Sequence, residues 1–224
     1  MQAVLTAEQQ QRYREQGYVV VSGLIPENAA KAAEAAMWRL LELNPTDRTG
    51  WPRSEMNHRN YRDPALLACF TEALLGAAAE LGGEDPASYR PPSSAYTINI
   101  FPQEEEWCWP HPHIDHARKE DRQLVFPRPF RVACMLYLSD TPPHGAGTIV
   151  WPGSHSKLEA LAQSDRQRYE LMWTLACDLG RVELGPPLEL TPQQGDAVFY
   201  HYLCAHSGSM NTSDRPRLAL NMKW

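Results

Sequence analysis

The sequence predicts a mainly β fold with flanking helices, built as a double-stranded β-helix, or jelly roll. From about Ser94 onward, short β-prone runs alternate with Pro and Gly clusters, as in a barrel or sandwich of short strands: AYTINIF, RVACMLYLS, GTIVWP, GDAVFYHYL and RLALNMKW. Before residue 94 the chain is rich in helix formers instead. The length of 224 residues suits one such unit with its supporting helices.

The first elements follow from capping and composition. Thr6 and Gln9 have the spacing of a capping box, which predicts a helix that ends at Gly17. The next run, YVVVSGLI, is β-branched and predicts a strand. A second helix is expected over PENAAKAAEAAMWRLLEL, with Pro26 in its first turn, and a third over PALLACFTEALLGAAAELGG, ended by its Gly pair.

We expect one domain over 1–224, because no internal repeat or low-complexity linker divides the chain. Residues 1–93 would form a mostly helical N-terminal support, and residues 94–224 the jelly-roll core. One segment near 156–179, SKLEALAQSDRQRYELMWTLACDLG, has helical composition and predicts one or two helices inserted between strands.

Composition limits the classes of partner. The formal net charge of −6 lacks the basic excess of nucleic-acid-binding proteins. No apolar run has the length of a signal peptide core or a membrane span, so a cytoplasmic location, a small-molecule substrate and no membrane or nucleic-acid partner are expected. The five cysteines form no CxxC pair and are expected to be reduced and mostly buried: Cys69, Cys108, Cys134, Cys177 and Cys204. The oligomeric state is not indicated.

The densest group of metal-ligating residues is HPHIDH, residues 111–116. In a strand, His113 and Asp115 point to one face while Ile114 points to the other. His206, at the end of a later β-prone run, is the candidate third ligand. Two His and one carboxylate on one side of an ion match the facial triad of non-haem Fe(II) oxygenases, although zinc accepts the same ligands. A surface or core histidine explains the short HxD pattern alone equally well.

Arg217 lies among apolar neighbours on the last β-prone run, where an unpaired guanidinium would be costly. Its planar fork of donors suits the distal carboxylate of 2-oxoglutarate. Two alternatives remain open: Arg217 pairs with a local carboxylate, or Arg215 takes the role instead.

Together these motifs resemble the phytanoyl-CoA dioxygenase family, which includes ectoine hydroxylase. The resemblance runs from EQGYVVVSGLIPENAAKAA through TINIFP, HID, MLYLSD and WPGSH to GDAVFYHYLCAHSGSMNTSDRPRLAL. It implies Fe(II) held by His113, Asp115 and His206, and 2-oxoglutarate held by Arg217 and contacted by Asn99. It also implies O₂ as co-substrate. Halogenating relatives replace the carboxylate by a small residue, so Asp115 favours hydroxylation or a related oxidation.

Other residues near these motifs are candidates for the pocket wall. The three tryptophans Trp107, Trp109 and Trp151 are expected there, or in ordinary core packing. His111 and His116 line the pocket or face solvent. Two loops rich in Arg and aromatic residues, 46–64 and 117–129, form a lid or are simply solvated. The turn 152–155 is interpreted as structural, with Gly153 and Ser154 leading into a helix.

The sequence therefore predicts an Fe(II)- and 2-oxoglutarate-dependent dioxygenase. It would hydroxylate or otherwise oxidise a C–H bond of a small molecule, releasing succinate and CO₂. Two alternatives stand beside it. One is a metal-binding, cupin-like jelly roll with hydrolase or isomerase activity, in which Arg217 has no role, and the other is a non-catalytic ligand-binding or sensor protein. The sequence does not indicate the substrate.

Overall fold

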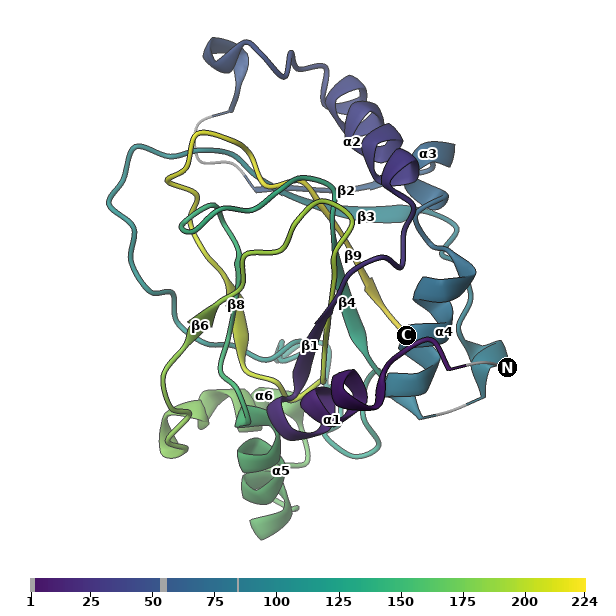
Figure 1. Cartoon of the computed structure of the whole chain (residues 1–224). Helices are drawn as coiled ribbons and strands as arrows, with labels where there is room; N and C mark the ends of the chain where they lie inside the picture. Colours follow the sequence, from purple (N-terminus) through teal and green to yellow (C-terminus); the bar gives the residue numbers. More distant parts are fainter. Residues whose placement is uncertain (1–2, 53–55, 84) are drawn as a thin grey trace.

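The computed structural model describes residues 3–52, 56–83 and 85–224, which form two antiparallel sheets with helices around them (Figure 1). The larger sheet has the strand order β1-β7-β4-β9-β3-β2 and the smaller sheet the order β6-β5-β8. Figure 1 shows α2, α3 and α4 along one side of the larger sheet, while β6 and β8 lie on the other side. The predicted mainly β architecture with flanking helices is present.

The first helix and strand match the prediction. Helix α1 (Ala7–Gln16) starts at a complete capping box: Thr6 accepts from the Gln9 backbone N–H, and the Gln9 side chain accepts from the Thr6 backbone. It ends at Gly17, whose φ of 77° needs a residue without a Cβ. Strand β1 (Tyr18–Val21) follows directly. Helix α2 (Glu27–Leu41) has Pro26 at its N-cap rather than inside its first turn.

The third predicted helix is wrong as one continuous element. The structure divides it into α3 (Pro64–Leu67) and α4 (Glu72–Gly82). Thr71 causes the break, because its hydroxyl accepts from the Leu74 N–H as an N-cap and donates to the Leu24 carbonyl. Helix α4 ends at Gly83, as the Gly pair predicted.

The interpretation of 46–64 as a loop is also wrong in part. A short 3₁₀ helix (Arg48–Gly50) is followed by strand β2 (Met56–Tyr61), which pairs along its whole length with β3 (Ala95–Ile100). The sequence MNHRNY lacks an apolar alternation because β2 is the edge strand of the larger sheet. Residues 53–55 of this segment lie outside the described residues.

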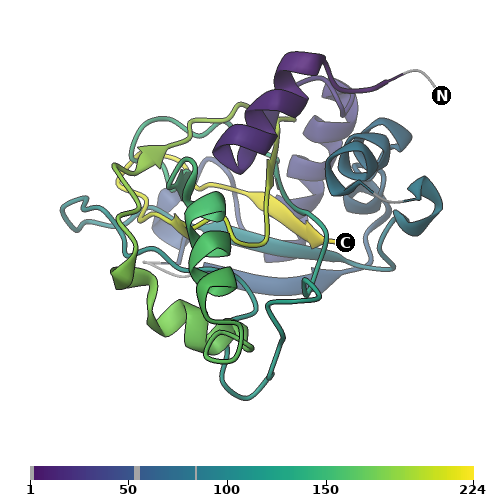
Figure 2. The same cartoon turned by 90° about the horizontal axis from the view of Figure 1, so that it is seen from below.

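The remaining strands are short. They are β4 (Ala133–Tyr137), β5 (Thr148–Val150), β6 (Leu188–Glu189), β7 (Ala197–Tyr200), β8 (His206–Gly208) and β9 (Ala219–Lys223). The helical segment between β5 and β6 contains α5 (Ser154–Ser164) and α6 (Met172–Cys177), seen from below in Figure 2. Two further 3₁₀ turns are Pro86–Ser88 and Leu179–Arg181.

Strand alternation divides the interior into two apolar clusters, one on each face of the larger sheet. On β4, Cys134 and Leu136 join the cluster that packs against α2 and α4, whereas Ala133 and Met135 join the cluster on the other face. The same two-residue period applies to β9, where Leu220 faces the helices. The second face is therefore left to line a cavity between the sheets.

Two compositional expectations have structural counterparts. All five cysteines are free, and Cys69, Cys134 and Cys204 are buried while the other two are exposed. Among the described residues, no helix is long and apolar enough to cross a bilayer.

Candidate metal centre

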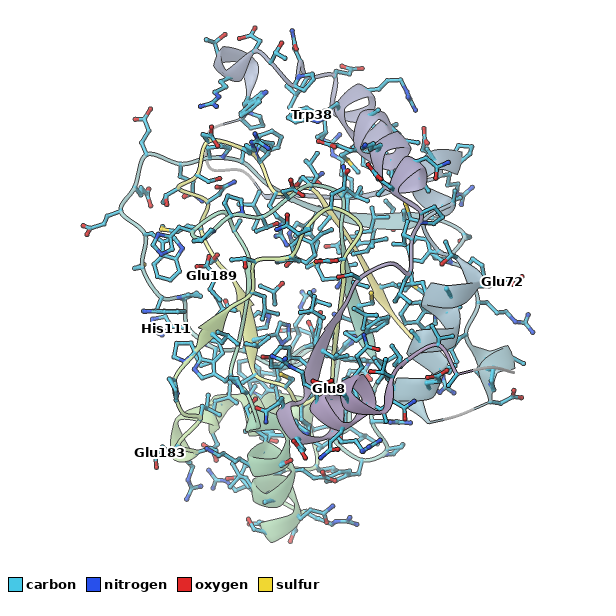
Figure 3. The ribbon with its side chains drawn as sticks, in the orientation of Figure 1. Glu8, Trp38, Glu72, His111, Glu183 and Glu189 are labelled. Atoms are coloured by element: carbon cyan, nitrogen blue, oxygen red, sulfur yellow. The ribbon has the colours of Figure 1, made fainter. Side chains whose placement is uncertain are left out.

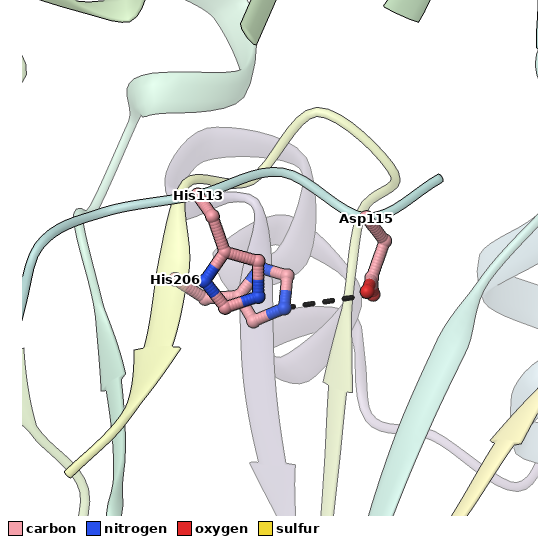
Figure 4. A group of neighbouring side chains, drawn as sticks. All are labelled: His113, Asp115 and His206. Carbon is pink, nitrogen blue, oxygen red and sulfur yellow. Dashed lines mark ion pairs between the residues drawn. The ribbon is translucent and has the colours of Figure 1, made fainter. Parts of the chain in front are cut away.

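Three side chains that the sequence singled out meet between the two sheets (Figure 4). His113, Asp115 and His206 each offer one ligand atom, and these atoms all lie within 4.8 Å of one another. The rings of His113 and His206 have centroids 4.5 Å apart, and His206 Nε2 lies 3.5 Å from Asp115 Oδ2. Within the described part of the chain, this is the one group of His, Cys, Asp and Glu with such spacing.

The local structure that brings them together differs from the predicted strand. His113 forms an isolated antiparallel bridge with His206, through two backbone hydrogen bonds of 2.9 and 3.0 Å. The chain then turns, so Asp115 lies in a turn and not in a strand. Ile114 still points away and is buried in the apolar cluster on this face of the sheet. His206 also begins its own strand, β8, and does not end the preceding one.

His206 is held in one tautomer. Its Nδ1 lies 2.9 Å from the Cys204 carbonyl, which only accepts, so Nδ1 carries a proton and Nε2 is the nitrogen that faces the site. The segment before it is anchored by the turn 152–155, because Ala205 N–H donates to Ser154 Oγ at 2.9 Å. Helix α5 begins at Ser154 with Gly153 as its N-cap, as that turn predicted.

Two groups hold the carboxylate of Asp115 in place. Lys223 Nζ lies 2.9 Å from Oδ1, and the Tyr200 hydroxyl donates to Oδ2 at 3.3 Å. Burial raises the pKa of Asp115, but the neighbouring His206 and Lys223 charges outweigh it and leave that pKa below its ordinary value. Asp115 is therefore an ionised ligand at neutral pH.

The protonation states of the site suit metal binding. Loss of water around the ring, and then the charge of His206, lower the pKa of His113. His113 is the most exposed of the three residues. Its ring nevertheless lines the cavity, and the cavity walls exclude part of the water around it. A neutral imidazole and a carboxylate are the forms that ligate a cation.

The donor set fits a divalent cation. His206 Nε2 and the Asp115 carboxylate face each other across 3.5 Å, so a cation bound there would be attracted by the carboxylate and would accept the Nε2 lone pair. Two imidazole nitrogens and one carboxylate oxygen on one side of the ion are the ligands of non-haem iron.

The three residues lie in a cavity of about 580 Å³, a volume typical of small-molecule sites. Strand β3 contributes Tyr96, Ile98 and Ile100, while β9 contributes Asn221 and Lys223. The remaining lining residues are His58, Gln103, Met135, Thr148, Tyr200, Ser207, Gly208, Ser209, Met210 and Arg217, together with the three candidate ligands.

Arg217 projects into this cavity from a position that is 1% exposed. Its Nε and Nη1 have no hydrogen-bond partner, and no described carboxylate pairs with it. The guanidinium carbon lies 5.8 Å from the centroid of the Tyr137 ring. Burial lowers the pKa of Arg217, yet a guanidinium stays protonated in proteins. A buried cation with two free donors is a strong binding site for a carboxylate.

Arg215, the predicted competitor, points elsewhere. Its side chain is 67% exposed and lies 3.9 Å from Asp214. It does not line the cavity. Of the two arginines, only Arg217 is placed to bind a ligand beside the candidate metal site.

Asn99 is not brought together with the other candidates. It is fully buried, but its Nδ2 faces Met37 Sδ of α2 at 3.3 Å, and its Oδ1 has no partner. The strand period explains this placement: Tyr96, Ile98 and Ile100 face the cavity, so Asn99 lies on the opposite face of β3. This position departs from the co-substrate contact that the family resemblance predicts.

The other wall candidates lie outside the cavity. His111 is exposed at the periphery (Figure 3), and His116 packs against Phe130 with ring centroids 5.2 Å apart. Trp107 stacks on His144, Trp109 is 52% exposed, and Trp151 is buried in the apolar core. None of these residues lines the cavity among the described residues.

The two candidate lid segments also differ from each other. No residue of 117–129 lines the cavity, and Val125 N–H instead bonds to the Glu170 carbonyl just before α6. From 46–64, His58 does line it, and its Nδ1 lies 2.9 Å from the Tyr96 hydroxyl.

Sequence reasoning missed three cavity residues around Asp115. Tyr200, Asn221 and Lys223 all line the cavity, and the Tyr200 hydroxyl links Asp115 to Asn221 Nδ2 at 3.3 Å. A signal was present for two of them. In RLALNMKW, Arg217, Asn221 and Lys223 are separated by even numbers of positions, which places Asn221 and Lys223 on the same strand face as Arg217.

Comparison with known proteins agrees with this site. Residues 13–219 match the family described as Phytanoyl-CoA dioxygenase (PhyH). The chain belongs to the phytanoyl-CoA dioxygenase family. The family predicted from the sequence is thereby confirmed. No curated protein sequence matches the chain.

Solved structures show the same fold. The carbocyclase SnoK from nogalamycin biosynthesis, described as non-heme and alpha-ketoglutarate-dependent, has a TM-score of 0.67 and 22% identity, covering 98% of this chain and 83% of that one. The epimerase SnoN, in complex with Fe3+, alpha-ketoglutarate and nogalamycin RO, has a TM-score of 0.63 and 20% identity. The match covers 96% of this chain and 80% of SnoN. EctD from S. alaskensis with bound Fe has a TM-score of 0.60 and 18% identity. The match covers 98% of this chain and 76% of EctD. The predicted jelly-roll fold is confirmed.

Proposed function

We propose that this member of the phytanoyl-CoA dioxygenase family is an Fe(II)- and 2-oxoglutarate-dependent dioxygenase. It oxidises a C–H bond of a small-molecule substrate, by hydroxylation or a related oxidation. When bound, iron and 2-oxoglutarate supply the oxidation of substrate by O₂, coupled to conversion of 2-oxoglutarate to succinate and CO₂. The predicted cytoplasmic location stays a prediction.

Each residue of the site has a role in this proposal. His113, Asp115 and His206 hold the iron, with the Cys204 carbonyl fixing the His206 tautomer. Arg217 binds the distal carboxylate of 2-oxoglutarate. Three protein ligands would leave positions on the ion free for co-substrate and O₂.

The protein also keeps the reacting region low in water. Ile98, Ile100, Met135 and Met210 give the cavity an apolar wall next to the three ligands. Such a wall limits side reactions of a reactive oxidant and orients a substrate C–H bond.

The observation that carries the proposal is Arg217. A metal site alone is also compatible with a hydrolase or isomerase of the cupin kind, which has no use for a buried arginine. Here the guanidinium is 1% exposed with two unpaired donors, in the same cavity as the three candidate ligands. Burying two guanidinium donors without an acceptor is unfavourable, so a carboxylate ligand is the simplest explanation.

Anaerobic titration tests the proposal. Purified protein is loaded with Fe(II), and 2-oxoglutarate is added while the weak visible charge-transfer band of the chelate is followed. We expect one Fe(II) per chain, and a band that requires both components. Under air, 2-oxoglutarate should then be converted to succinate.

The matched variant is Asp115→Ala, which leaves two neutral imidazoles facing a dication and should weaken Fe(II) binding and abolish succinate formation. Tight binding of zinc with no effect of 2-oxoglutarate would favour the hydrolase or isomerase. Binding of both Fe(II) and 2-oxoglutarate without any turnover across substrates would favour the sensor.

A further inference from the structure

Lys223 is the last residue of β9, and Arg217 lies two residues before that strand begins. Residues at every second position of a strand share a face, and Arg217, Asn221 and Lys223 all line the cavity. Six positions along a strand correspond to roughly 20 Å. The two cations are therefore attached to the backbone far enough apart to bind different acceptors.

The ammonium of Lys223 is held firmly beside the metal ligands. Its Nζ lies 2.9 Å from Asp115 Oδ1 and 5.6 Å from the centroid of the Phe130 ring, and its side chain is 25% exposed. An ammonium has three donors, so the contact with Asp115 leaves two for another acceptor. Asp115 is the only carboxylate that lines the cavity among the described residues.

With iron and 2-oxoglutarate bound, the cavity including Lys223 would carry a net positive charge. A dication, the Asp115 carboxylate, doubly charged 2-oxoglutarate and the Arg217 guanidinium together sum to zero. Lys223 adds one positive charge that no described residue of the cavity offsets. A low-dielectric site with an excess charge favours a ligand that carries the opposite one.

We propose that Lys223 is the substrate-binding cation of this enzyme and that the substrate is a monocarboxylic acid. This inference rests on the proposed function, since the count includes iron and 2-oxoglutarate. Binding of the substrate carboxylate to Lys223 places the adjacent carbon skeleton near the three metal ligands and along Ile98, Met135 and Met210. A dianion such as a phosphate monoester would overshoot the single excess charge.

A binding experiment without turnover tests this assignment. The probes are monocarboxylic acids of two to ten carbons, linear and aromatic, each paired with its primary amide. Affinities are measured by calorimetry under argon, on protein saturated with Fe(II) and 2-oxoglutarate. Because charge-assisted hydrogen bonds are worth more than neutral ones, the best acid should bind about tenfold or more tightly than its amide.

Two variants at Lys223 test the inference, and one variant elsewhere serves as the control. Lys223→Met should lose the preference for the acid, leaving the pair within about threefold, whereas Lys223→Arg should retain it. Lys119→Met removes one exposed positive charge outside the cavity and should change nothing. Fe(II) and 2-oxoglutarate affinities and the unfolding temperature are measured for each variant, so that a misfolded or iron-free sample is recognised.

The outcomes separate this inference from the proposed function. Absence of Fe(II) or 2-oxoglutarate binding in the wild-type protein would overturn both. If the cofactors bind but no acid binds, or acids and amides bind equally, Lys223 does not select the substrate. An acid preference that persists in Lys223→Met, while Fe(II) affinity falls, would show that Lys223 only positions Asp115.

Discussion

Replacing Arg217 by Ala tests whether the buried guanidinium is the anchor of 2-oxoglutarate. In the wild-type protein this group is 1% exposed and has two unpaired donors. Truncation would leave the distal carboxylate of the co-substrate desolvated and without a partner, which typically costs about 2–5 kcal/mol. At roughly 1.4 kcal/mol per factor of ten, 2-oxoglutarate affinity should fall on the order of 30-fold to several thousand-fold.

The assay has two readouts. The first is the anaerobic titration of the Fe(II) protein with 2-oxoglutarate. The second is thermal unfolding, because a ligand at 100 times its Kd adds about 2.7 kcal/mol of stability, or roughly 5–10 °C at 2–4 °C per kcal/mol for a chain of this size. The wild-type protein should show this shift, and Arg217→Ala should show almost none at the same concentration.

Arg215→Ala is the internal control, since its exposed side chain lies beside Asp214 and outside the cavity. Fe(II) affinity should change little in either variant, because neither arginine is a candidate metal ligand. Unaltered 2-oxoglutarate affinity in Arg217→Ala, or a larger loss in Arg215→Ala, would refute the reasoning.

Three further predictions concern the scaffold. Asn99→Val should leave 2-oxoglutarate affinity within about threefold, because the side chain lies on the far face of β3; a loss above tenfold in the same titration would restore the family-derived contact. Gly147→Ala should lower stability by about 1–3 kcal/mol or more in urea unfolding, because its Cβ would lie 2.1 Å from the Leu190 carbonyl oxygen, whereas Gly180→Ala, with open space, should not. Burial lowers the pKa of His201 to about 3 in the folded protein, whereas the unfolded chain has the ordinary value of about 6.5. Between these two values only the unfolded state binds the proton, so the free energy of unfolding should fall as pH drops from 6.5 towards 3, by at most about 1.4 kcal/mol per pH unit. His201→Asn should flatten that slope, and an equally steep slope in the variant would assign it to other groups.

Local signals in the sequence were sufficient for the elements that depend on local interactions. The Thr6 capping box defines the start of α1, and Gly17 and Gly83 end helices with left-handed backbone. Strands with a continuous apolar run, such as β4, were also predictable, because both of their faces are buried against separate clusters.

Elements fixed by long-range contacts were not predictable in this way. The tripeptide His206–Gly208 has no β-propensity of its own and forms β8 because β5 pairs with it. Thr71 divides a run of good helix formers because its hydroxyl also bonds to Leu24, far away in the sequence. Strand β2 likewise depends on its pairing with β3.

The candidate site shows the same limit. The types and spacing of His113, Asp115, His206 and Arg217 were readable, since their chemistry requires those side chains in any fold. Their surroundings were not, and Asn99 shows why: a motif match transfers a residue type, whereas the side on which a strand residue points depends on register.

Register links the helical layer to the chemistry of β9. Leu218, just before β9, and Leu220 within it are buried in the cluster that packs against α2 and α4. Because these leucines hold their face against the helices, the alternating residues Arg217, Asn221 and Lys223 are forced to the cavity face. A slip of one residue would place two cations in the apolar core, at a cost far larger than the pairing energy of a five-residue strand. The apolar layer thus sets the distance between the proposed co-substrate anchor and the proposed substrate cation, although it touches neither.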